Sequence, residues 1–146
     1  MTAFTIDLSP IARLNHAQFE QLCAANPDIK FERTRDGALV IMSPTGGETG
    51  RSNAELSADF VTWNRRTQLG VVFDSSTCFK LPNGGDRSPD VAWIARSRWA
   101  ALTPEQQQKF PPLCPDFVVE LVSPSDNINT VRDKMQEYLD SGLRLG

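Results

Sequence analysis

The sequence predicts an α/β (α+β) fold in which helices flank a central β-sheet. Two observations support this fold class. Apolar segments with strand periodicity alternate with segments of helical periodicity, and Gly, Pro or Asp-Gly turns separate them. The segments follow the order α, several β, α, β, β, α, β, α, which is typical of a sheet covered by helices. The length of 146 residues and the hydrophobic content of 40% suit one domain, so we expect residues 1–146 to form a single domain.

The first predicted elements are a helix and a hairpin, at residues 15–27 and 29–42. Asn15 is a favourable N-cap for the helix, which ends before Pro27. Asp36-Gly37 is a turn dipeptide with apolar residues on both sides, so the second segment is expected to fold back on itself.

A Gly-rich loop, SPTGGETG at residues 43–50, leads into a predicted helix of roughly a dozen residues. Leu56, Phe60 and Trp63 recur at i, i+4 and i+7 and mark the stripe that this helix is expected to bury. The loop lacks the Gly-Lys-Ser/Thr ending of a phosphate-binding loop, so we expect it to shape the surroundings of a site rather than to bind nucleotide.

The later elements are a strand-turn-strand unit in residues 71–85, a strand in 88–94, a short helix in 102–110, a strand in 116–122, and a last helix. The short helix has Thr103 as its cap, Pro104 at its first position and Gln106 in place for a capping box. The last helix ends at Gly142 and has an apolar face made of Val131, Met135, Tyr138 and Leu139. The final residues, GLRLG, resemble the first step of another strand. Either the last strand of the sheet is missing or an edge of the sheet is left short, and we expect the first, with a domain that is truncated at its C-terminus.

The composition argues against several classes of protein. A net charge of −3 disfavours tight, sequence-independent binding of nucleic acid by charge alone, although a local basic patch is compatible with it. The three cysteines lie far apart without Cys-x-x-Cys spacing, which argues against a disulfide framework or a zinc knuckle. No signal peptide or membrane-spanning run is visible, so the sequence predicts a cytoplasmic protein without a membrane partner.

Glu120 is the residue that the apolar pattern explains least. It lies in the middle of PDFVVELV, where only apolar side chains adjoin it. A carboxylate is rarely placed there unless it is paired, bound to a metal or part of a chemical site. Asp116 lies on the same strand face, but four residues separate it from Glu120 by about 13 Å, too far to share one metal ion. Asp90, early in SPDVAWI, is the candidate partner if the two strands are neighbours.

Two carboxylates from adjacent strands, with water in the remaining positions, would suit Mg²⁺ or Mn²⁺. Such an ion stabilises charge on a phosphate and activates water, and a nearby lysine assists phosphodiester hydrolysis. As an alternative, Glu120 is a structural carboxylate paired with an arginine or facing water on a half-exposed strand.

Pro89-Asp90 followed by Glu120 in an apolar strand resembles the PD-(D/E)XK nuclease superfamily. Within it, the chain resembles the "putative restriction endonuclease" family abundant in cyanobacteria, long catalogued as a domain of unknown function. The segments DGALVIMSPTGGETG, SPDVAWI and PDFVVELVSPSD, with the lysine and tyrosine of RDKMQEYLDSG, carry the resemblance over roughly residues 31–142. The resemblance implies a restriction-endonuclease-like fold, a DNA substrate and Mg²⁺ or Mn²⁺ as cofactor.

The resemblance also implies a set of site residues. Asp90 and Glu120 would hold the metal. The usual lysine, two residues after the acid, is replaced by Val122, and Lys134 on the following helix would take its place. An acid from the first core helix would join them; Glu48 is preferred to Glu55 because it lies in the segment that carries the resemblance.

Other readings compete with the nuclease hypothesis. The chain could be a non-catalytic module that binds nucleic acid or protein and keeps the nuclease fold. It could also be a homo-oligomerisation unit, such as a homodimer, that pairs through an exposed sheet edge. His16, the only histidine, is expected at the surface without a catalytic role. The scattered arginines Arg65, Arg66, Arg87, Arg96 and Arg98 are individually expected to be solvated, although together they could contact a DNA backbone.

Overall fold

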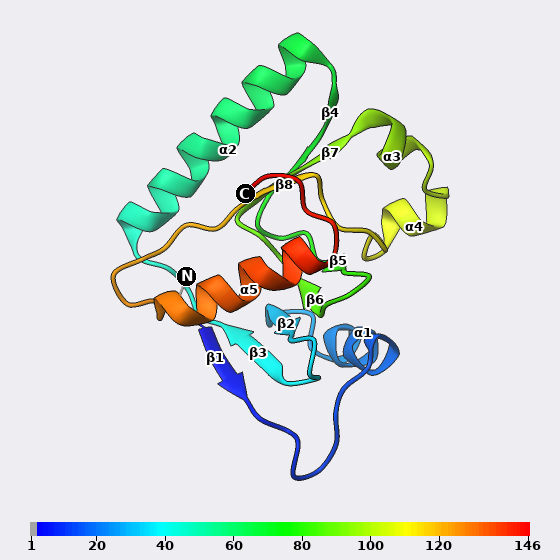
Figure 1. Ribbon diagram of the computed structural model, residues 1–146. Helices are drawn as coiled ribbons and strands as arrows, with labels where there is room; N and C mark the ends of the chain where they lie inside the picture. The colour runs from blue at the N-terminus through cyan, green and yellow to red at the C-terminus, as the bar shows by residue number, and fades with distance from the viewer. Residues whose placement is uncertain (1–2) are drawn as a thin grey trace.

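The computed structural model describes residues 3–146 and confirms the mixture of helices and strands that the sequence predicts. The strands form two antiparallel sheets (Figure 1). One has five strands in the order β1-β3-β2-β6-β5, and the other has three in the order β4-β7-β8. In the described part of the chain, no helix is long and apolar enough to cross a bilayer.

The five-stranded sheet is built around the predicted hairpin. Its strands are β1 (Ala3–Ile6), β2 (Phe31–Arg33), β3 (Leu39–Met42), β5 (Phe79–Lys80) and β6 (Asp86–Arg87). The turn between β2 and β3 contains Gly37 with a φ of 84°, a conformation that suits glycine. Strand β1 pairs with β3 and was not predicted, because a four-residue edge strand has little periodicity of its own.

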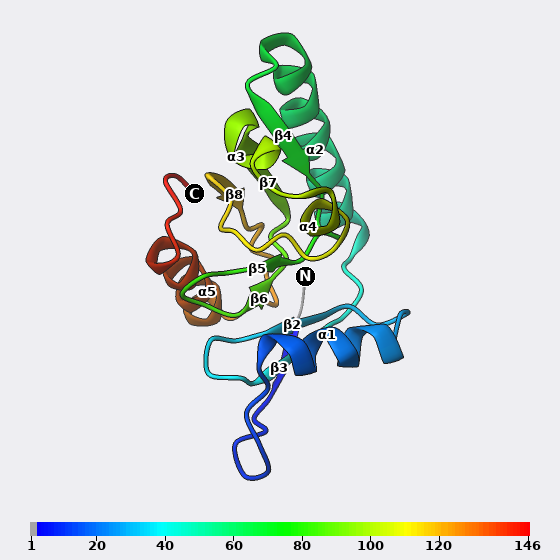
Figure 2. The same ribbon diagram turned by 90° about the vertical axis from the view of Figure 1, so that its right-hand side faces the viewer.

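Helix α1 (His16–Ala25) covers one face of this sheet (Figure 2). Its start is the predicted one: the Asn15 side chain accepts from the Gln18 amide, and Gln18 closes a capping box. Phe19 is fully buried and packs in a cluster with Phe31 and Leu39. This small core fixes the hairpin and leaves its opposite face free to line a site.

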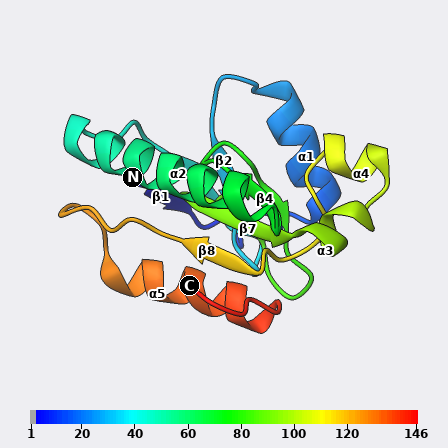
Figure 3. The same cartoon turned by 90° about the horizontal axis from the view of Figure 1, so that it is seen from above.

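The three-stranded sheet consists of β4 (Gly70–Phe73), β7 (Val91–Ala95) and β8 (Phe117–Val119). Helix α2 (Gly47–Thr67) lies on one face of it and helix α5 (Ile128–Asp140) on the other (Figure 3). Strand alternation explains the division, because Phe117 stacks against Phe60 of α2 while Val118 packs in one core cluster with Tyr138 of α5.

Helix α2 has 21 residues and is longer than predicted. It ends only where Gln68 adopts a left-handed conformation with a φ of 53°. The predicted stripe faces the sheet, with Trp63 edge-on to Trp93 at 5.8 Å between ring centroids. However, no residue of α2 is fully buried. The stripe packs on the sheet but is only partly buried, less than predicted.

The short helices are α3 (Arg96–Ala100) and α4 (Pro104–Gln108). The predicted capping box between Thr103 and Gln106 is present, whereas α3 was not predicted. Helix α5 begins at the Asn127 cap, and its Tyr138 is fully buried, as predicted. Leu139 is 52% exposed, which contradicts its assignment to the buried face.

The chain passes from the five-stranded to the three-stranded sheet through Ser88-Pro89-Asp90, between β6 and β7. Proline has no amide hydrogen to offer a ladder, so the strand is interrupted there. Near the end of the chain, Leu145 forms an isolated parallel bridge with Phe117 beside β8. This is the position at which the sequence predicted that a further strand begins.

Candidate functional site

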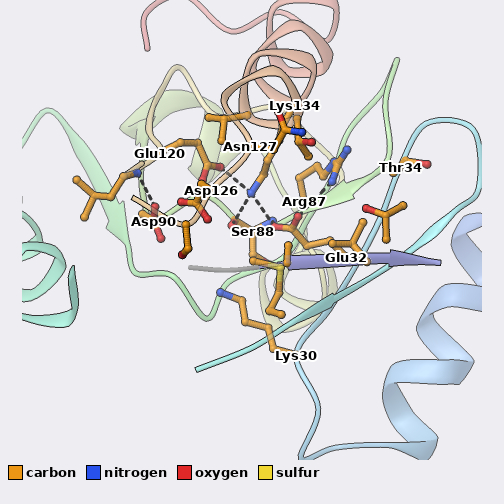
Figure 4. A pocket seen from close by; sticks show the side chains of 18 residues that line it. Lys30, Glu32, Thr34, Arg87, Ser88, Asp90, Glu120, Asp126, Asn127 and Lys134 are labelled. Carbon is orange, nitrogen blue, oxygen red and sulfur yellow. Dashed lines mark hydrogen bonds and ion pairs between the residues drawn. The ribbon is translucent and has the colours of Figure 1, made fainter. Parts of the chain in front are cut away.

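A pocket of about 200 Å³ lies where the two sheets and α5 meet (Figure 4). Strand β2 contributes one wall, the crossing between the sheets and the residues after β8 contribute another, and α5 contributes a third. The charged side chains that line it are Lys30, Glu32, Arg87, Asp90, Glu120, Asp126 and Lys134. Three of the four predicted site residues, Asp90, Glu120 and Lys134, are therefore brought together.

Asp90 and Glu120 come from neighbouring strands, as predicted. Val91 of β7 is the register partner of Val119 of β8, and extending this register by one residue beyond the paired strands places Asp90 opposite Glu120. The Leu121 amide donates to Asp90 Oδ2 at 2.6 Å and holds this carboxylate at the end of β8. Strand β8 is shorter than the predicted 116–122, so Glu120 lies just beyond its last residue, where the sheet opens into the pocket.

Lys134 extends from α5 into the pocket, and its ammonium has three oxygen acceptors. Its Nζ lies 2.8 Å from Glu120 Oε1 and 2.8 Å from Glu32 Oε1, and it donates to the Ser88 carbonyl at 3.3 Å. The lysine side chain is only 10% exposed. The helix that follows the Glu120 strand therefore brings an amine to Glu120, as the sequence suggested.

Glu32 is a site residue that the sequence reading missed. Its side chain is 2% exposed, and besides Lys134 it accepts from Arg87 Nη1 at 3.2 Å and from the Ser88 amide at 2.9 Å. The available signal was its place in the hairpin strand: Lys30, Glu32 and Thr34 alternate with Phe31 and Arg33, and all three line the pocket. Three polar residues on one face of a strand in a buried hairpin are therefore a signal of a site.

Arg87 lies directly before Ser88 and is buried, so its predicted exposure was wrong. It connects Glu32 with Glu137 of α5, donating from Nε and Nη2 to the Glu137 oxygens at 3.0 and 2.8 Å. A guanidinium can satisfy two carboxylates at once, which explains why an arginine rather than a lysine occupies this buried position. The result is one continuous chain of charges from Glu137 to Glu120.

The charges in this chain shift the pKa values of its members. Burial raises the pKa of Glu120 to about 7, Glu32 and Asp90 add to the increase, and Lys134 opposes it. Burial also disfavours ionised Glu32, but Lys134 and Arg87 outweigh it and keep the pKa of Glu32 below its ordinary value. Burial alone would lower the pKa of Lys134, yet the carboxylates of Glu120 and Glu32 raise it, so the amine stays charged.

Replacing Glu137 with glutamine is expected to flatten the loss of stability in acid. Burial opposes the ionised form of Glu137, but hydrogen bonds from Arg87 outweigh it and lower the pKa of this carboxyl in the folded state. Its stabilising effect is therefore complete above about pH 4.5, its ordinary pKa, and is lost as the pH falls through the lower folded value. Urea unfolding at pH 7, 5, 4 and 3 measures the effect.

The wild type should lose more unfolding free energy between pH 5 and pH 3 than Glu137→Gln does. The matched control is Glu55→Gln, an exposed glutamate whose replacement should leave the pH profile of the wild type unchanged. Parallel profiles for the wild type and Glu137→Gln would contradict the assignment of a depressed pKa to Glu137.

The structure does not bring Glu48 into the site. Its side chain is 89% exposed in the first turn of α2, and it pairs with Arg51 at 3.7 Å. Glu55 is also exposed, and neither residue lines the pocket. The reason is that α2 lies on the far side of the three-stranded sheet from α5 (Figure 3). The additional acid comes instead from strand β2, as Glu32.

Asp116 and His16 lie outside the pocket. Asp116 is a buried residue in the bend directly before β8, where it accepts from the Ala95 amide at 2.8 Å and pairs with Arg98 at 2.9 Å. His16 has a 36% exposed side chain and bonds the buried Asp86 at 2.7 Å. Asp86 also binds Arg33 at 2.6 Å, so His16 helps to anchor α1 to β6.

The donor atoms of the pocket fit a hard divalent cation. Asp90 and Glu120 offer only carboxylate oxygens, the ligands that Mg²⁺ and Mn²⁺ prefer. Lys134 and the Tyr138 hydroxyl both contact Glu120 on Oε1, so Oε2 has no hydrogen-bond donor among residues 3–146. Within the same residues no group of three or more His, Cys, Asp or Glu side chains is placed to hold a metal. A cation here would therefore have two protein ligands and complete its shell with water or substrate oxygens, a common arrangement for Mg²⁺.

Comparison with known proteins finds a matching family and similar solved structures. Residues 16–146 match the model of the Uma2 family, whose description is "Putative restriction endonuclease". The fold is similar to that of "a putative nuclease belonging to DUF820" from Anabaena variabilis ATCC 29413, with a TM-score of 0.64 and 15% sequence identity. This alignment covers 77% of the present chain and 62% of the other, so the chain spans less than two thirds of that protein. No curated protein matches the sequence.

Proposed function

Because residues 16–146 match its family model, the chain belongs to the Uma2 family of "putative restriction endonucleases", and we propose that it is a metal-dependent endonuclease that hydrolyses DNA phosphodiester bonds. The observation that carries the proposal is the convergence of Asp90, Glu120 and Lys134 in one pocket. Two carboxylates lie at the ends of paired strands and line the same pocket, and a buried ammonium lies 2.8 Å from one of them. This combination suits the hydrolysis of a charged ester better than it suits a purely structural role.

Each of the three residues has a separate task in the proposal. Asp90 and Glu120 would hold Mg²⁺ or Mn²⁺, which supplies stabilisation of the negative charge that develops on the phosphate. The Lys134 amine, charged in the pocket, would orient the attacking water or donate to a phosphate oxygen. The pocket has room for a phosphate and ordered water, with a volume of about 200 Å³, rather than for a whole base pair. A DNA backbone would therefore enter with a single phosphate.

The decisive experiment is incubation of purified protein with supercoiled plasmid DNA, in the presence of Mg²⁺, Mn²⁺ or EDTA. We expect nicked and linear products with either cation and intact plasmid with EDTA. The double variant Asp90→Asn/Glu120→Gln, purified in the same way, controls for contaminating nuclease and should leave the plasmid intact.

Two outcomes would contradict the proposal. One is intact plasmid under all conditions with folded wild-type protein. The other is equal cleavage by the wild type and the double variant. DNA binding that persists without cation and in the double variant would favour the alternative, a non-catalytic nucleic-acid-binding module.

A further inference from the structure

The Lys134 ammonium occupies the place of a cation in the pocket. It is the positive charge in contact with Glu120, and it lies between Glu120 and Glu32 with 2.8 Å to an oxygen of each (Figure 4). An ammonium and a divalent cation attract the same carboxylate oxygens, and like charges repel each other at short range. Both therefore cannot keep full contact with Glu120 at the same time.

Of the three acceptors of Lys134, only one would also bind the metal ion. Glu120 is one of the two proposed metal ligands, whereas Glu32 and the Ser88 carbonyl are not. An ammonium has three N–H donors, and if its bond to Glu120 is lost it retains Glu32 Oε1 at 2.8 Å and Ser88 O at 3.3 Å. The amine can therefore leave Glu120 and remain in the pocket, with one N–H free.

Glu32 is held in a fixed position from which it can accept the amine. Its carboxylate already accepts from the Ser88 amide at 2.9 Å and from Arg87 Nη1 at 3.2 Å, and Arg87 is itself held by Glu137. Glu120 is held more loosely, by the Tyr138 hydroxyl at 3.0 Å and by Lys134. Of the two carboxylates on either side of the amine, Glu120 is thus the one with freedom to change its partner.

We propose that Lys134 acts as an internal competitor of the divalent cation for Glu120, and that Glu32 is the positioning residue that takes the amine when the cation binds. The inference rests on the proposed metal site at Asp90 and Glu120. In the metal-free protein the charged Lys134 neutralises Glu120 in place of the metal ion. Lys134 becomes available to substrate only when the metal binds. Loading of the cation and release of one N–H of Lys134 would be a single event.

The first test measures Mn²⁺ affinity by electron paramagnetic resonance of the free ion, without DNA. Lys134→Gln removes the competitor and should bind Mn²⁺ about tenfold more tightly than the wild type. Glu32→Gln leaves the amine with a weaker second acceptor and should bind Mn²⁺ several-fold more weakly. In the Lys134→Gln background the Glu32→Gln change should have little effect, because no amine is left to position.

A matched control separates direct competition from the general effect of removing a positive charge. Lys30 lines the same pocket, but its amine donates to the Ser75 carbonyl and not to a carboxylate. Lys30→Gln should therefore change Mn²⁺ affinity by less than about threefold, since it removes a longer-range charge but no direct contact with Glu120. Equal tightening in Lys30→Gln and Lys134→Gln would overturn the inference.

A second measurement uses the wild type alone, so that a folding defect of a variant cannot decide the result. The chain has only four lysines, and ¹⁵N NMR of their Nζ groups can resolve each of them. The Lys134 signal should move with Mg²⁺ concentration along the binding curve, while those of the exposed Lys109 and the half-exposed Lys80 stay in place. Bound Mg²⁺ with an unmoved Lys134 signal would also overturn the inference.

The failure of this inference is distinguishable from failure of the proposed function. Equal Mn²⁺ affinity of the wild type and Lys134→Gln, in a protein that cleaves DNA, removes the competition but leaves the nuclease proposal intact. Absence of Mn²⁺ binding in the wild type and in every variant removes the metal site, and with it both proposals.

Discussion

Replacing Asp90 with asparagine is expected to lower metal-dependent DNA cleavage by about 100- to 1,000-fold without unfolding the protein. Asparagine has the shape of aspartate and keeps one oxygen that can accept the Leu121 amide, now 2.6 Å from Asp90 Oδ2. What it loses is the negative charge, which is half of the charge that the proposed site offers to a cation. We therefore expect catalysis to fall steeply while the unfolding free energy changes by only about 1 kcal/mol.

The measurements are the initial rate of plasmid nicking in Mn²⁺ and urea unfolding, for the same preparation. Asp28→Asn is the matched control: it is the same chemical change at an exposed position before β2, and it should keep the wild-type rate. If Asp90→Asn nicks DNA at the rate of the wild type, Asp90 does not hold a required cation. If both rate and stability collapse, the residue acts mainly through its bond to the end of β8.

Replacing Glu32 with alanine is expected to destabilise the fold by about 3–5 kcal/mol, a large part of the stability of a domain of this size. The change removes the shared acceptor of two buried cations, Lys134 and Arg87, and of the Ser88 amide. The lysine side chain is 10% exposed and that of the arginine 7%, so water cannot replace the lost carboxylate. Breaking a buried pair from one side is costly because it leaves an uncompensated buried charge.

Urea unfolding followed by tryptophan fluorescence measures this loss, since the chain has three tryptophans. Glu55→Ala is the matched control, a glutamate with a 66% exposed side chain that should change the unfolding free energy by less than about 0.5 kcal/mol. Glu32→Gln should lie between the two, because its amide oxygen still accepts one hydrogen bond. A loss of less than about 1 kcal/mol in Glu32→Ala would show that the charged network contributes little to the fold.

The candidate site shows where sequence reasoning reached its limit. Asp90 and Glu120 could be paired from the sequence because each is an acid in an apolar strand, and a metal requires acids from neighbouring strands. Lys134 followed from the resemblance and from the nearness of a helix to the strand before it. The prediction of Glu48 was wrong because the sequence does not show which face of the sheet its helix covers. Its side chain is 89% exposed, on the helix that lies across the sheet from α5.

Local sequence determined most elements of this protein by itself. The Asn15 and Thr103 caps, the Asp36-Gly37 turn and the apolar strand before Glu120 were predictable, because capping, turn formation and periodicity depend on residues a few positions apart. Only the tertiary structure decided how the site is neutralised. Lys134 and Glu32 are 102 residues apart in sequence, and Arg87 and Glu137 are 50 apart. Such pairs form because folding buries charges that must then find a partner, and the choice of partner depends on which elements meet in space.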